Sequence, residues 1–140
     1  MDYIAIANAF RKELESLRNS GQLPNELNDF PGGCCGTVSE LLGDYLNTMH
    51  GLGCEYVWGT QGQKTHAWLE HDGIVIDITG DQFQGRPSVY VAEKDDWYLA
   101  WEESHRETAV HHRNAYSYSE ERELLHTLLA GAGLPNPDTL

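Results

Sequence analysis

The sequence predicts an α+β domain in which N-terminal helices pack on an antiparallel sheet and another helix follows at the C-terminus. Three observations support this class. Apolar residues recur at helical spacing near the N-terminus, short β-rich runs fill the middle of the chain, and a further amphipathic segment lies near its end. The 140 residues have a hydrophobic content of 40%, which is enough for one core. We therefore expect residues 1–140 to form a single domain.

Two amphipathic helices are expected before the sheet. In residues 3–18 an apolar stripe recurs every three or four positions, formed by Ile6, Phe10, Leu14 and Leu17. In residues 36–50 a second stripe ends at Gly51 and is formed by Val38, Leu41, Leu42, Tyr45, Leu46 and Met49. The segment between them, "GQLPNELNDFPGG", is rich in Pro, Gly and Asn and predicts a loop.

The later elements follow from shorter patterns. Strands are predicted over "CEYVWGT", the stretch "THAWLEHDGIVIDIT", "SVYVA" and "WYLAW", and Cys54 is expected to be a small buried hydrophobe. The last helix is predicted over "SEERELLHTLLAGAG", with Ser119 as its N-cap. We expect the tail "LPNPDTL" to fray, and His111 and His112 to lie on the surface.

The stretch "THAWLEHDGIVIDIT", residues 65–79, predicts a β-hairpin with Asp72-Gly73 as a two-residue turn. Side chains alternate along a strand, so two faces are expected. One is a core face of Ala67, Leu69, Ile74, Ile76 and Ile78, and the other carries His66, Trp68, Glu70, Val75, Asp77 and Thr79. His66 and Asp77 are then diagonal neighbours that a hydrogen bond can join. A four-residue loop would set them directly opposite, whereas a three-residue loop would separate them.

Such a pair has two interpretations. An aspartate that accepts a hydrogen bond from one ring nitrogen orients the imidazole and raises the basicity of the other nitrogen, as a catalytic base requires. The alternative is a semi-buried pair that only orders the sheet.

The stretch "FPGGCCGTVSELLGDYL" favours the catalytic interpretation. The helix is expected to begin at or just after the two cysteines, where the helix dipole and free backbone N–H groups stabilise a thiolate. Cys35 lies three residues before Val38, on the stripe expected to face the sheet, and is preferred as nucleophile. Cys34 is the alternative. It is expected to face solvent or pack under the loop.

The motif "HAWLE", a short turn and "IDIT", preceded by a helix-starting cysteine, resembles the transglutaminase-like branch of the papain-like cysteine enzymes. The resemblance spans about residues 30–83. It implies a papain-like fold with Cys35, His66 and Asp77 as a catalytic triad, and Trp68, Glu70 and Thr79 complete the hairpin motif. Gly36 departs from the aromatic residue common after the nucleophile. The following "GDQFQGRP" is interpreted as a cleft lining or as a polar turn.

These observations predict thiol-dependent acyl transfer at an amide, namely peptide or isopeptide hydrolysis, glutamine deamidation or transamidation. Trp68 and the backbone amide of Cys35 are suggested to shape the oxyanion site. No cofactor is expected. The alternative function is a catalytically inactive papain-like domain that binds a protein partner, which Trp97 and Trp101 would serve if they are exposed. A redox role of the Cys34-Cys35 pair is a third hypothesis, disfavoured because vicinal disulfides are strained.

Composition restricts the partners. With 22 acidic and 9 basic residues, the net charge of −13 repels nucleic acid and anionic membranes. It is compatible with a protein or peptide substrate, including a cationic one. No C-x-x-C or H-E-x-x-H motif indicates a metal site. No signal peptide or membrane span is evident, so a cytoplasmic protein with reduced thiols is expected, although export without a classical signal stays open.

Overall fold

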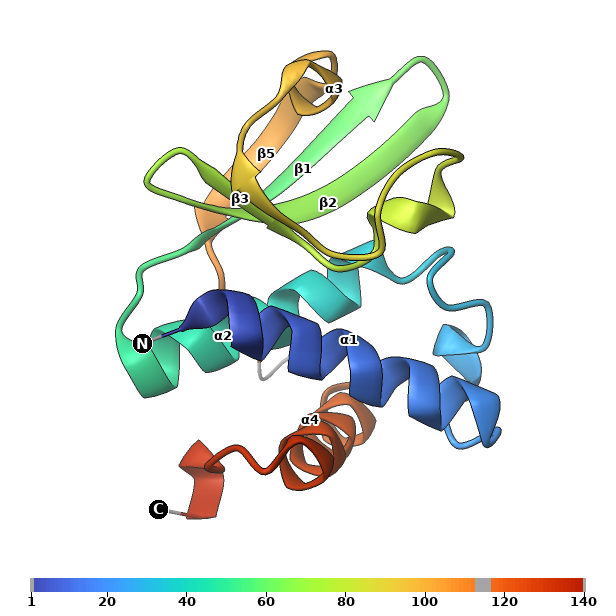
Figure 1. Cartoon of the computed structure of the whole chain (residues 1–140), viewed down its shortest axis with the longest axis vertical. Helices are drawn as coiled ribbons and strands as arrows, with labels where there is room; N and C mark the ends of the chain where they lie inside the picture. Colours follow the sequence, from blue (N-terminus) through green and yellow to red (C-terminus); the bar gives the residue numbers. More distant parts are fainter. Residues whose placement is uncertain (1, 113–116, 140) are drawn as a thin grey trace.

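The computed structural model describes residues 2–112 and 117–139, which form an α+β fold with an antiparallel sheet (Figure 1). The helices are α1 (Tyr3–Asn19), α2 (Cys35–His50), α3 (Asp96–Leu99) and α4 (Tyr118–Ala132). The strands are β1 (Glu55–Gln61), β2 (Lys64–His71), β3 (Ile74–Asp77), β4 (Tyr90–Glu93) and β5 (Glu102–Thr108). Short 3-10 turns are η1 (Asn25–Leu27), η2 (Gly80–Gln82) and η3 (Pro137–Thr139).

The five strands follow the order β4-β3-β2-β1-β5, and every neighbouring pair is antiparallel. Figure 1 shows α1, α2 and α4 gathered on one side of this sheet, as the predicted class requires. Helix α2 packs directly on β1 and β2, and α1 packs on both α2 and α4. Helix α2 therefore lies against β2, the central strand of the sheet.

Two hydrophobic clusters occupy the two faces of the sheet. The larger one lies between the helices and the sheet and contains the predicted stripes of α1 and α2 together with Leu69, Ile76 and Ile78. The smaller one lies on the opposite face and is formed by Val57, Trp68, Val75, Tyr98 and Trp101. The two faces predicted for the hairpin are thus confirmed.

The hairpin has the two-residue turn that the Asp72-Gly73 dipeptide predicts. Both residues have positive φ, 49° and 78°, as a type I′ turn demands. Leu69 pairs with Ile76, and Glu70 pairs with Val75. Extending this register sets His66 and Asp77 diagonally on one face.

The expectation of a strand at "WYLAW" is wrong. Residues 96–99 form α3, because the Asp95 side chain accepts a hydrogen bond from the Tyr98 backbone N–H and caps a helix there. The fifth strand comes after it, in a charged and mostly exposed segment at the sheet edge. Cross-strand pairing with β1 makes this segment a strand, and its local sequence carries no apolar alternation that would have predicted it.

Three expectations near the C-terminus are also wrong. The N-cap of α4 is Ser117 rather than Ser119. His111 is buried, because its ring stacks on Tyr118 and its Nε2 lies 2.8 Å from Glu121, whereas His112 is exposed as expected.

The tail is anchored rather than frayed. The carboxylate of Asp138 accepts a hydrogen bond from Arg122 at 2.8 Å and lies 2.6 Å from His126. Leu140, at its end, lies outside the described residues.

Candidate active site

Helix α2 begins at Cys35, directly after the loop that contains Gly33. Gly33 has φ of 72°, a backbone conformation that favours glycine and turns the chain into the helix. The first backbone N–H groups of a helix have no hydrogen-bond partner within the helix. In α2 these groups belong to the turn that starts at Cys35. The thiol therefore lies at the positive end of a four-turn helix, in partial contact with solvent.

The neighbouring Cys34 is less suited to nucleophilic chemistry. It is buried, its thiol lies 3.5 Å from the Pro31 carbonyl, and burial raises its pKa to about 12. Cys54 is likewise buried, with a pKa raised by burial to about 12. All three thiols are free, which gives no support to a Cys34-Cys35 disulfide.

His66 and Asp77 are in direct contact. His66 Nε2 lies 2.7 Å from Asp77 Oδ2, and both side chains are fully buried. His66 precedes the part of β2 that pairs with β3, and Asp77 ends β3, so the hydrogen bond crosses the hairpin diagonally where the ladder stops. The pairing that the sequence predicts is thus present.

The Asp77 carboxylate accepts hydrogen bonds on both oxygens. Besides His66, the Tyr98 hydroxyl donates to Oδ2 at 2.8 Å. The Thr79 backbone N–H donates to Oδ1 at 2.9 Å, and the Thr79 hydroxyl donates to it at 3.4 Å. Since every partner of Asp77 is a donor, the acid is held as an acceptor and the Nε2–H tautomer of His66 is favoured.

The other ring nitrogen of His66 faces Gln82 and the Cys35 thiol. Gln82 Nε2 lies 3.1 Å from His66 Nδ1 and donates to the Thr79 carbonyl at 3.2 Å. Burial opposes ionisation of Cys35, but hydrogen bonding and the charge of His66 outweigh it. With further hydrogen bonds from the Ala67 backbone and Gln82, they hold the pKa of Cys35 below its ordinary value.

The pKa of His66 moves in the opposite direction. Burial disfavours its charged form, yet hydrogen bonds and opposite charges from Asp77 and Cys35 raise its pKa to about 9. A lowered thiol pKa beside a raised imidazole pKa favours a thiolate-imidazolium pair at neutral pH.

Aromatic rings enclose His66 on the face opposite the helices. Four ring centroids lie between 5.1 and 5.9 Å from the His66 centroid, those of Trp68, Phe83, Trp97 and Trp101. Trp101 is buried and Trp97 is half-buried, so the two tryptophans do not form the exposed pair that the binding-domain alternative requires. Packing around the imidazole accounts for their burial.

The indole N–H of Trp68, suggested to help shape the oxyanion site, is engaged within the fold. Trp68 is 1% exposed, and its indole N–H donates to Glu70 at 2.8 Å. An indole has a single N–H donor, so this donor is not free to bind a substrate oxygen. The Trp68 ring packs beside the His66 ring, with the two centroids 5.6 Å apart. The Trp101 indole N–H, by contrast, is buried with no partner among the described residues.

Two side chains of this site had not been assigned from the sequence. Gln82 lies in "GDQFQGRP", which signalled a cleft lining or a polar turn without indicating which residue faces the thiol. Tyr98 lies in the segment misassigned as a strand. A capping aspartate followed by aromatic residues was the available signal for the helix that carries it.

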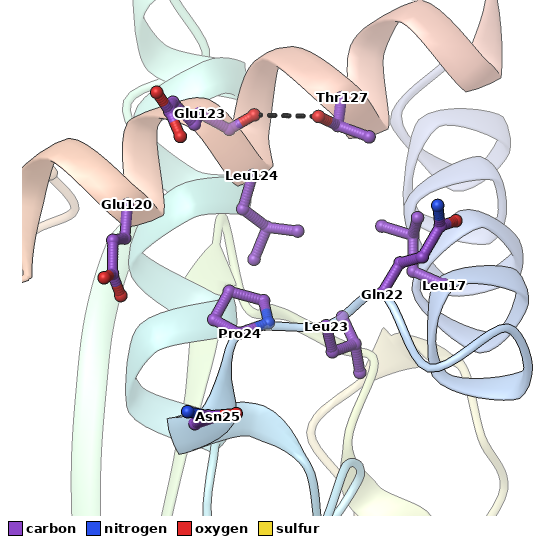
Figure 2. A pocket seen from close by; sticks show the side chains of 9 residues that line it. All are labelled: Leu17, Gln22, Leu23, Pro24, Asn25, Glu120, Glu123, Leu124 and Thr127. Carbon is purple, nitrogen blue, oxygen red and sulfur yellow. Dashed lines mark hydrogen bonds between the residues drawn. The ribbon is translucent and has the colours of Figure 1, made fainter.

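A separate pocket of about 390 Å³ lies between the end of α1, residues 22–25 and α4. Figure 2 shows Leu17, Leu23 and Leu124 in this pocket, with the carboxylates of Glu120 and Glu123 nearby. The pocket shares no lining residue with the Cys35 site.

Other kinds of site receive little support. Within residues 2–112 and 117–139 no group of three or more His, Cys, Asp or Glu side chains could hold a metal ion. None of the helices in this described part of the chain is long and apolar enough to span a membrane. Comparisons with protein-family models, curated proteins and solved structures find no match to the chain.

Proposed function

We propose that this chain is a papain-like enzyme of the transglutaminase-like branch that transfers an acyl group from an amide through Cys35, His66 and Asp77. The observation that carries the proposal is that the His66 imidazole lies between the Asp77 carboxylate and the Cys35 thiol. Its Nε2 is held by a buried carboxylate, and its Nδ1 side faces a thiol of lowered pKa at a helix N-terminus.

In the first step the Cys35 thiolate attacks the amide carbonyl carbon and forms the Sγ–C bond. The protonated His66 Nδ1 then gives its proton to the leaving amine as the C–N bond breaks. Asp77 keeps the ring oriented and stabilises its charge. Backbone N–H groups at the start of α2 are the donors available for the developing oxyanion.

The resulting thioester is cleaved in a second step. His66 accepts a proton from water or from an amine, which attacks the thioester carbon and releases Sγ. Water completes hydrolysis or deamidation, and an amine completes transamidation. The substrate is a peptide or protein amide.

The alternative is a non-catalytic binding domain. It was motivated by the acidic surface and by tryptophans expected to be exposed; the net charge of −13 remains, but Trp97 and Trp101 pack around His66. The labelling experiment below distinguishes this binding domain from the enzyme.

Iodoacetamide labelling followed by peptide mass spectrometry tests the proposal. Cys35 should be alkylated at neutral pH at least about tenfold faster than a free cysteine peptide, because its thiolate fraction is higher. Cys34→Ala should keep this rate, whereas Cys35→Ala should lose it and retain the circular dichroism of the wild type. Alkylation of Cys35 no faster than the peptide would overturn the proposal in favour of a binding domain.

A further inference from the structure

Two aromatic side chains of β1, Tyr56 and Trp58, lie on the α2 side of the sheet beside the proposed nucleophile. In the β1-β2 register Tyr56 pairs with Leu69, and Trp58 pairs with Ala67. Directly paired residues of antiparallel strands share a face, and Leu69 belongs to the core beneath the helices. Tyr56 and Trp58 therefore project toward α2.

Contacts of two intermediate residues, Ala67 and Gly36, place Trp58 and Tyr56 near Cys35. The backbone of Ala67 lies close enough to the Cys35 thiol to help lower its pKa, the Ser39 hydroxyl in the first turns of α2 donates to the Ala67 carbonyl at 3.5 Å, and Ala67 is the direct cross-strand partner of Trp58. On the helix, a Cβ added to Gly36 would lie 3.2 Å from the Tyr56 hydroxyl. Tyr56 therefore contacts the first turn of α2, and Trp58, two residues further along β1 on the same face, lies across from Ala67.

The rings of Trp58 and Tyr56 are only partly packed against the rest of the protein. Trp58 is half-buried and belongs to neither hydrophobic cluster, whereas Tyr56 packs on the edge of the larger one. Half-buried aromatic faces beside a nucleophile can bind part of a substrate, and their negative π faces favour a cation.

Two carboxylates lie beside these rings. Glu40 follows Gly36 by one helical turn, so it lies on the same side of α2 as the Tyr56 contact. Glu107 pairs directly with Tyr56 across β1 and β5, so it shares that face. Burial, together with the negative charges of Glu40, Cys35 and Glu107, raises the pKa of Tyr56 to about 12.

Few positively charged side chains lie close enough to neutralise the carboxylates of Glu40 and Glu107. Among the described residues Glu40 forms no ion pair, and Glu107 contacts only the imidazoles of His105 and His112, at 3.3 and 3.4 Å. No lysine or arginine of the described chain pairs with either carboxylate.

We propose that Trp58, Tyr56, Glu40 and Glu107 form a substrate subsite beside Cys35 that selects a cationic side chain, lysine or arginine, next to the acyl carbon that is attacked. This inference rests on the proposed function, and it specifies the substrate class as basic peptides or protein segments. The aromatic wall contacts the aliphatic stem and faces the cation, and the two carboxylates supply the opposite charge.

Chloromethyl ketones of N-acetylated lysine and norleucine test the subsite. In each reagent a thiolate displaces chloride and forms an S–C bond, and the side chain lies beside the ketone that replaces the scissile carbonyl. The second-order inactivation rate at Cys35 is measured by mass spectrometry. The lysine reagent should react about tenfold faster than the norleucine reagent, which has the stem without the charge.

The ratio of these two rates is then compared among variants, so that any change in thiol reactivity cancels. The ratio should fall toward one in the double variant Glu40→Gln, Glu107→Gln and should decrease in Trp58→Leu. The control Glu120→Gln, Glu123→Gln removes two charges at the separate pocket and should keep the wild-type ratio.

Each failure has its own signature. Fast iodoacetamide labelling of Cys35 without preference for lysine would overturn the subsite alone. An equal loss of preference in the control variant would assign the preference to overall charge and also overturn it. Slow iodoacetamide labelling together with no preference would overturn both the subsite and the proposed function.

Discussion

At the scale of single residues, Asp77 illustrates why a carboxylate differs from an amide. Its two oxygens receive hydrogen bonds from His66, Tyr98 and Thr79, and all of these partners are donors. An asparagine there must direct its NH₂ group at a donor on one side. If the amide oxygen faces the Thr79 N–H, the NH₂ group forces His66 Nε2 to become an acceptor and moves its proton to Nδ1.

We therefore expect Asp77→Asn to lower the rate of amide turnover by about 10²–10⁴-fold with little change in KM. The reason is the altered tautomer and the loss of the charge that stabilises imidazolium. Steady-state kinetics on a peptide amide measure the effect, and circular dichroism establishes that the variant is folded. A wild-type kcat/KM in Asp77→Asn would show that the pair only orders the sheet.

The pH dependence of turnover follows from Cys35 and His66 together. The rate should rise on the acidic side as Cys35 ionises, at a pH below the ordinary pKa of a cysteine, and should fall through about pH 9 as His66 loses its proton. Because the pKa of His66 is raised, its charged form stabilises the fold fully below pH 6.5, and this contribution is lost toward about pH 9. Turnover still rising above pH 9 would contradict a protonated His66.

At the scale of elements, the position of α2 on the sheet depends on Gly43. A Cβ at this position would overlap Ala109 and approach Leu69 Cδ2 to 2.8 Å, so no larger residue fits without a shift of the helix. Gly131 in α4 offers a matched comparison, because a Cβ there would meet only the flexible end of the Glu13 side chain.

We expect Gly43→Ala to lower the free energy of unfolding by about 1–3 kcal/mol, since overpacking exceeds the gain in helix propensity. Gly131→Ala should be neutral or stabilise the protein by up to about 1 kcal/mol. Urea denaturation of both variants measures the difference. Equal stability of the two variants would mean that α2 is not closely packed on β2.

At the scale of the whole molecule, Arg11 joins the helical layer to the segment that carries Gln82. Its guanidinium donates to Ile78 O at 2.8 Å and to both carboxylate oxygens of Asp81 at 2.7 Å, and it lies over the Phe30 ring. The Arg11 side chain is 6% exposed and that of Asp81 is 26% exposed, so the guanidinium end of this ion pair is shielded from water. Through these contacts α1 fixes both the loop before Cys35 and the turn that holds Gln82.

Arg11→Lys should lower the free energy of unfolding by about 1–3 kcal/mol, because lysine keeps the charge but loses the two-pronged contact. Turnover should fall as well, since η2 and Gln82 lose their anchor. Arg18→Lys is the control. Arg18 makes weaker contacts, at 3.5 Å with the Phe30 carbonyl, at 3.4 Å with Asn19 and at 5.9 Å with the Phe30 ring centroid, so its replacement should change stability by less than about 0.5 kcal/mol. Denaturant unfolding and kinetics that show equal effects for both would refute the anchoring role.

The sequence by itself determined the elements whose signals are local. The Asp72-Gly73 turn fixed the hairpin register, and with it the diagonal of His66 and Asp77, because a two-residue turn leaves no freedom in strand pairing. The glycines before Cys35 and the apolar stripe after it determined where α2 begins. These parts of the fold and of the candidate site were therefore predictable.

Only the tertiary structure decided which contacts are made by η2 and α3, the segments that fold back onto the sheet. Gln82 reaches His66, and Tyr98 reaches Asp77, because η2 and α3 return across the face of the sheet. Strand β5 forms because an edge of β1 was available, although its own residues are charged. Such contacts join residues far apart in the chain, and local propensity carries no information about which distant partner a side chain will meet.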